Sequence, residues 1–171
     1  MITSAPGTSR AASGRPSFAT LFRTEPSTLG TDVAAVATRV ALVWIFFYYG
    51  AQKLFGWFDG PGIHETGLFM ASTAHLHPGT FFAVVAGVIE LGGAVALAVG
   101  LVSRLAALAL LVDQVIAMVT VTWAHGLVSS TTAGYDLNLA LVALALVIVG
   151  IGAGRPSVDA VIARRLRERS G

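Results

Sequence analysis

Residues 80–101 read TFFAVVAGVIELGGAVALAVGL, an almost unbroken apolar run with a single charged residue, Glu90, near its middle. A helix needs about 20 mostly apolar residues to cross the hydrocarbon core of a bilayer. This stretch therefore predicts a membrane-spanning helix that carries a carboxyl group inside the membrane. Because a charge at that depth is costly, we expect Glu90 to have a partner elsewhere in the chain.

Three further apolar runs, at residues 36–57, 105–124 and 137–153, predict three more spans. Of the 171 residues, 55% are hydrophobic and 12% are charged, and the mean hydropathy is +0.77. A soluble domain usually carries about 25% charged residues. The sequence therefore predicts an all-α membrane protein, a bundle of four transmembrane helices that forms one domain over residues 32–159.

Turn-forming residues mark the limits of these spans. Residues 59–62, Asp-Gly-Pro-Gly, are expected to stop the first helix, and residues 77–79, His-Pro-Gly, to precede the second. Only residues 102–104 separate the second and third spans, which predicts a tight antiparallel hairpin. In the longer first loop, residues 63–74 are expected to form a short interfacial helix.

The two ends of the chain have a different composition. Residues 1–31 are rich in Ser, Thr, Pro, Gly and Ala, which is typical of a disordered tail. The first long apolar run begins too late for a cleaved signal peptide, so the tail is expected to remain on the mature protein. Residues 160–171 form a basic tail, and residues 159–169 are predicted to form a short helix against anionic lipid.

The basic residues predict the orientation in the membrane. Of the 11 Lys and Arg residues, all but Lys53 fall in the tails, the first turn of the first span or the turn between the second and third spans: Arg10, Arg15, Arg23, Arg39, Arg104, Arg155, Arg164, Arg165, Arg167 and Arg169. By the positive-inside rule both termini are cytoplasmic. The pI near 9.5 is therefore interpreted as a signal for the lipid bilayer, and no nucleic-acid partner is predicted.

Four charged residues fall within or close to the predicted spans, with two polar neighbours: Lys53, Glu90, Asp113, Asp136, Gln114 and Asn138. A rise of about 1.5 Å per residue puts most of them in the outer half of the membrane, with Lys53 level with Glu90 or Asp136. Small residues surround Glu90 and Asp113 at helical spacings, which favours contact with neighbouring helices over lipid. The sequence therefore predicts one buried polar site, in which Lys53 pairs with Glu90.

This site has two interpretations. Buried ion pairs can serve only to fix the register of helices. Alternatively, the residues bind a small polar ligand or a quinone head group, or relay protons, since ionisable groups within membranes mark functional sites by default. Three acids cannot all be ionised beside one lysine at low cost, so at least one carboxyl group is expected to be protonated at neutral pH.

The sequence gives little indication of disulfides, metal sites or catalytic motifs. The chain has no cysteine, which excludes disulfides and cysteine-ligated metals. Of the loop histidines His64, His75, His77 and His125, only the pair His75 and His77 has a spacing that suggests a metal site, which would need three or four converging ligands. Solvated loop histidines are the commoner case, and no metal is predicted. No complete catalytic motif is visible, so a non-catalytic membrane subunit is favoured over an enzyme.

Several stretches, in order along the chain, resemble the DoxX family. They are Tyr49 to Trp57 with Gly60-Pro61-Gly62, Glu90 to Gly93 with Gly100-Leu101 and Arg104, Tyr135-Asp136-Leu137, and Gly154 to Asp159. The resemblance covers roughly residues 39–159. It departs at Asp136, where the family more often has Glu.

The resemblance implies a four-helix protein of the bacterial cytoplasmic membrane, in a family named after a subunit of a quinone-linked oxidoreductase. It also implies an accessory or anchoring role in a redox and oxidative-stress complex, with superoxide dismutase and a sulfurtransferase as partners. The chain itself is not predicted to hold a cofactor, although a quinone is retained as a ligand of the buried site. A homo-oligomer is a further expectation.

Overall fold

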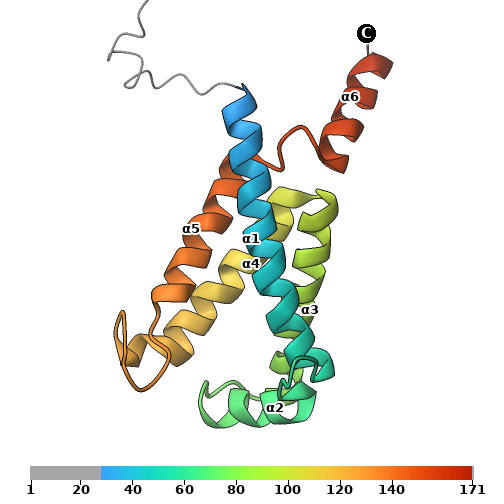
Figure 1. Cartoon of the computed structure of the whole chain (residues 1–171). Helices are drawn as coiled ribbons and strands as arrows, with labels where there is room; N and C mark the ends of the chain where they lie inside the picture. The colour runs from blue at the N-terminus through green and yellow to red at the C-terminus, as the bar shows by residue number, and fades with distance from the viewer. Residues whose placement is uncertain (1–27, 171) are drawn as a thin grey trace, which may run out of the picture.

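The computed structural model describes residues 28–170, and every regular element in that range is a helix (Figure 1). The order is α1 (Thr28–Phe55), α2 (Gly62–Ser72), α3 (Gly79–Val99), α4 (Ser103–Ala117), the π-helical turn η2 (Met118–Thr122), the 3-10 turn η3 (Trp123–His125), α5 (Asp136–Ile151) and α6 (Val158–Ser170). Most of the predicted tail, residues 1–27, lies outside the described residues. The helix α1 begins at Thr28, inside the segment predicted as tail.

Three helical segments of the described chain are long and apolar enough to cross a membrane. They are Thr28–Phe55, Gly79–Val99 and the continuous run Ser103–His125, which combines α4, η2 and η3. The fourth predicted span corresponds to α5, which is apolar but has only 16 residues. At about 1.5 Å per residue it is roughly 24 Å long, less than the ~30 Å hydrocarbon core.

The predicted turns agree with the observed element boundaries. The helix α1 ends before the Asp59–Gly62 turn, and α3 begins at Gly79 directly after His77 and Pro78. A short turn joins α3 to α4, where Gly100 adopts a left-handed conformation with φ of 70°. A side chain at Gly100 would also meet Ser157 at 2.5 Å, so the turn is packed closely against the start of α6.

The bundle packs α1 along α3 and α4 along α5, while α2 lies across one end (Figure 1). The start of α1, the α3–α4 turn and α6 gather at the opposite end. The core is apolar and lies toward that end, with these side chains fully buried: Leu42, Phe46, Leu97, Leu110 and Ile148. The polar residues of interest lie between this core and α2.

Candidate functional site

Lys53 and Glu90 form a buried ion pair between α1 and α3, as the sequence predicted. The Lys53 ammonium donates to both carboxylate oxygens of Glu90, at 2.5 Å each. The Glu90 side chain is only 3% exposed, whereas that of Lys53 is 22% exposed. The Lys53 ammonium also lies 5.7 Å from the ring centroid of Tyr49. Lys53 is therefore the more accessible member of the pair.

Two glycines let α1 and α3 approach closely where the pair forms. Gly50, one turn before Lys53, packs so tightly that an added Cβ would lie 2.6 Å from the backbone nitrogen of Leu91. Gly87, one turn before Glu90, leaves space for the side chain of Leu54. Small residues at such contacts allow membrane helices to pack backbone to backbone. The glycines therefore position the two charges opposite each other.

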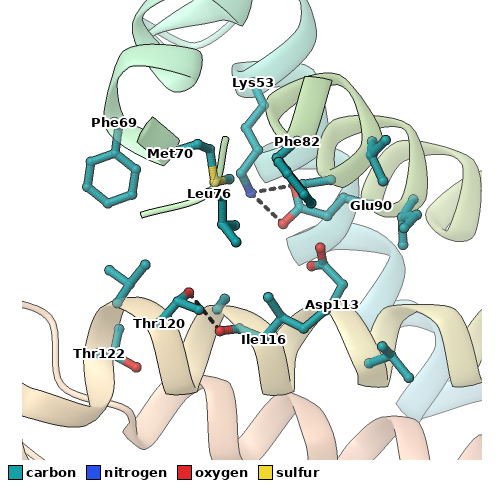
Figure 2. Close-up of a pocket in the computed structure, with 16 residues that line it drawn as sticks. Lys53, Phe69, Met70, Leu76, Phe82, Glu90, Asp113, Ile116, Thr120 and Thr122 are labelled. Atoms are coloured by element: carbon teal, nitrogen blue, oxygen red, sulfur yellow. Dashed lines mark hydrogen bonds and ion pairs between the residues drawn. The ribbon is translucent and has the colours of Figure 1, made fainter. Parts of the chain in front are cut away.

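Asp113 on α4 is the third charged residue at this position. Its carboxyl group points toward the Lys53–Glu90 pair, and all three side chains lie at the same end of a cavity (Figure 2). Its hydrogen-bond donor is the side-chain amide of Gln114, at 3.2 Å. Within residues 28–170, Asp113 makes no ion pair. Asp113 thus adds a second carboxyl group that has no cation of its own.

Gln114 and Asn138 extend this polar group toward α5. The Asn138 amide donates to Gln114 Oε1 at 2.9 Å, and Thr122 Oγ1 lies 3.1 Å from Asn138 Oδ1. A chain of hydrogen bonds therefore runs from Thr122 through Asn138 and Gln114 to Asp113. It holds the Asp113 carboxyl group and joins α4, η2 and α5.

The structure does not bring Asp136 into this cluster. Asp136 is the exposed first residue of α5, and its side chain has no hydrogen bond or ion pair within the described part of the chain. The depth expected from the sequence put Asp136 within reach of the Lys53 side chain. Depth alone, however, does not determine the direction in which a side chain points. The prediction that Lys53 meets Glu90 or Asp136 is thus resolved in favour of Glu90.

A cavity of about 290 Å³ lies between α2, α3, α4 and η2, and the three charged side chains line it at one end (Figure 2). Thr120 and Thr122 supply hydroxyl groups from η2. The remaining lining is apolar: Phe69, Met70, Leu76, Phe82, Val85, Ala86, Ile89, Val112, Ile116, Ala117 and Val121. The arrangement can hold an apolar body while its polar group meets ionisable side chains.

Parts of this cavity were not predicted from the sequence. Phe69 and Met70 come from α2, which was predicted as a helix but not as a wall of the site. The π-helical turn η2 supplies Thr120 and Thr122, and such turns are frequent at functional sites. No periodicity in the sequence indicates a π-helical turn, so these residues could not be assigned in advance.

The histidines predicted in the loops include His64, which lies in α2, and His125, which lies in η3. His64 lies 4.0 Å from the neighbouring Glu65, and both side chains are more than half exposed. Among the described residues, no group of three or more His, Cys, Asp or Glu side chains has the geometry to hold a metal ion.

Arg39 forms a second buried polar centre, at the other end of the bundle. It is 7% exposed and donates to the carbonyl oxygens of Leu97 and Ala98 at the end of α3. It also donates to those of Ala153 and Pro156 in the segment that joins α5 to α6. Arg39 was interpreted only as an orientation signal. However, it lies inside the predicted span 36–57, so the cost of a buried charge could have identified it.

Asp159 completes this end of the bundle. Its carboxylate accepts hydrogen bonds from the backbone amides of Val102 and Ser103, at 2.7 and 2.9 Å, and so caps the start of α4. Partial burial acts to raise the pKa of Asp159, but these hydrogen bonds and the nearby charge of Arg39 hold the pKa below its ordinary value. The Gly154–Asp159 segment therefore fastens α6 to the α3–α4 turn.

Long apolar helices, small residues at their contacts and a charged pair enclosed between them define an integral membrane protein of the helical-bundle class. The family model DoxX matches residues 34–123, just over half of the chain, from within α1 to the end of η2 and the first residue of η3. The chain belongs to the DoxX family. No curated protein and no solved structure matches it significantly.

Proposed function

We propose that this protein binds a small amphipathic molecule in the cavity beside Lys53, Glu90 and Asp113. The observation that carries the proposal is the composition of the cavity, in which apolar side chains surround a single charged end. Binding pockets are typically apolar with a few polar groups that orient the ligand. An ion pair that served only to fix helix register would not require a cavity of about 290 Å³ beside it.

We further propose that four helices cross the membrane and that both termini are cytoplasmic. Although α5 is short, it packs against α1 and α4 along the bundle, which supports its crossing with them. Arg39, Arg104 and Arg155 lie at the end of the bundle that carries α6, and the positive-inside rule supports a cytoplasmic position for that end. The cavity then lies toward the outer face, close to α2.

The binding proposal can be tested by native mass spectrometry of protein extracted in a mild detergent. We expect the wild-type chain to carry a molecule of defined mass that Ala86→Phe removes, because Ala86 lines the cavity. Val88→Phe is the matched control, since Val88 lies on the same helix but is 55% exposed outside the cavity. Wild-type protein that retains no small molecule, or equal retention in both variants, would contradict the proposal.

Family membership supports a second proposal, that the protein is an accessory subunit of a redox or oxidative-stress system in a bacterial cytoplasmic membrane. A quinone whose head group binds in the cavity would be one neutral ligand consistent with both this redox role and the binding proposal. Affinity purification in mild detergent tests the role directly. Recovery of an oxidoreductase, a dismutase or a sulfurtransferase would support it, and repeated recovery of the chain without any of them would count against it.

A further inference from the structure

The charges that line the cavity do not balance. Lys53, which donates to both oxygens of Glu90, is the one basic side chain that lines the cavity beside two carboxyl groups, so the cluster has one negative charge in excess when both acids are ionised. Asp113 faces the same space, and its hydrogen-bond donor, Gln114, is uncharged (Figure 2). An unpaired carboxylate in apolar surroundings is costly. Asp113 therefore requires either a proton or a cation from outside the chain.

The other walls of the cavity suit a cation with an apolar body. Phe69 and Phe82 provide aromatic rings, and Met70 provides a polarisable thioether. These groups suit the apolar or aromatic body of an organic cation, while the carboxyl groups at the other end suit its charge. A compact inorganic cation is disfavoured, because it needs several oxygen ligands to replace its water shell. Among residues 28–170, no three His, Cys, Asp or Glu side chains are grouped so as to hold a metal ion.

We propose that the cavity takes a small lipophilic organic cation, a tertiary or quaternary amine with an aromatic or short aliphatic body, whose charge is balanced by Asp113. This inference rests on the proposed binding function and names the class of its ligand. The apolar body occupies the space between α2 and α4, and the ammonium group lies at the charged end. One monocation per chain neutralises the single unbalanced carboxylate.

The volume of the cavity limits the size of this ligand. Drug-sized ligands occupy pockets of about 300–1,000 Å³. At about 290 Å³ the cavity lies at the lower end of that range, which suits a molecule of roughly ten non-hydrogen atoms. Benzyltrimethylammonium is of this size and joins a phenyl ring to a quaternary nitrogen. Neopentylbenzene has the same shape with carbon in place of the charged nitrogen.

The test is equilibrium dialysis of the purified full-length protein with benzyltrimethylammonium, with neopentylbenzene as the uncharged competitor. We expect the wild-type protein to bind the cation at least about tenfold more tightly, because a partly buried charge pair is worth more than about 1.4 kcal/mol. Asp113→Asn should lose that preference while still binding the neutral compound. Asp136→Asn, which removes an exposed carboxylate outside the cavity, should retain it.

The outcomes separate this inference from the proposal on which it rests. Equal affinity for the two compounds in the wild-type protein would overturn the cationic class but would leave the binding function standing, and this comparison needs no variant. Unchanged cation binding in Asp113→Asn would overturn the role of Asp113. If Asp113→Asn does not fold, Asp113→Glu should keep the preference, and its loss there would also contradict the inference. Failure to bind either compound, in protein that retains no small molecule in native mass spectrometry, would end both proposals.

Discussion

The ammonium of Lys53 lies 2.5 Å from each carboxylate oxygen of Glu90, and the two residues are 37 positions apart in the sequence. The contact joins α1 to α3 at the edge of an apolar cavity. Because each charge compensates the other in surroundings of low polarity, removing only one of them should be worse than removing both.

A double-mutant cycle measures this coupling. Lys53→Met and Glu90→Gln should each lower the free energy of unfolding by about 3–5 kcal/mol, since each strands a buried charge. The double variant should recover much of that loss, as followed by thermal unfolding in detergent. Asp136→Asn is the control and should stay within about 0.5 kcal/mol of wild type, because Asp136 is exposed. Additive losses in the double variant would show that the two residues are not coupled.

The close approach of α1 to α3 gives a second prediction. Gly50→Ala places a Cβ 2.6 Å from the backbone of Leu91, so the helices must separate, at a cost of about 1–3 kcal/mol. Gly92 also lies on α3, but a Cβ added there would have no atom within 4 Å. Alanine has a higher helix propensity than glycine, so Gly92→Ala is the matched control. In thermal unfolding, Gly92→Ala should therefore be at least as stable as wild type, and Gly50→Ala should be clearly less stable. Equal stability of the two variants would contradict the packing described for Gly50.

Arg39 is expected to contribute through its hydrogen bonds, beyond its charge. Arg39→Lys keeps the charge but cannot reproduce the contacts to Leu97, Ala98, Ala153 and Pro156. We expect a loss of about 3 kcal/mol or more in the free energy of unfolding. Arg165→Lys, at an exposed position on α6, should change stability by less than about 0.5 kcal/mol. Similar stability of the two variants would show that the hydrogen bonds of Arg39 contribute little, and would leave only its role in membrane orientation.

The proposed orientation can be tested because the chain has no cysteine, so an introduced cysteine is the only thiol. Ser72 ends α2, and Ala163 is exposed on α6 at the other end of the bundle. In intact cells Ser72→Cys should react with a membrane-impermeant thiol reagent, whereas Ala163→Cys should react only after the membrane is opened. The reverse pattern would invert the topology, and labelling of both in intact cells would contradict the four-span arrangement.

The hydropathy of the sequence and its turn residues predicted the helices and most of their ends, because apolar length and helix breakers act locally, but the start of α1 at Thr28 lies eight residues before the predicted span. The pairing of Lys53 with Glu90 followed from depth, and small neighbouring residues indicated that Glu90 faces another helix. The position of Asp136 did not follow, because the rotation of α5 about its axis depends on its packing. The cavity also could not be predicted, since it depends on the π-helical turn η2 and on the position of α2.

The most direct test of the binding function is an experimental structure of the protein extracted together with its native lipids and small molecules. We expect non-protein density in the cavity, in contact with Asp113 or Lys53 and continuous with an apolar body against Phe69 and Phe82. The same structure of Ala86→Phe should lack that density. A wild-type cavity that is closed by its own side chains, or that contains only water, would contradict the claim that this protein binds an amphipathic molecule.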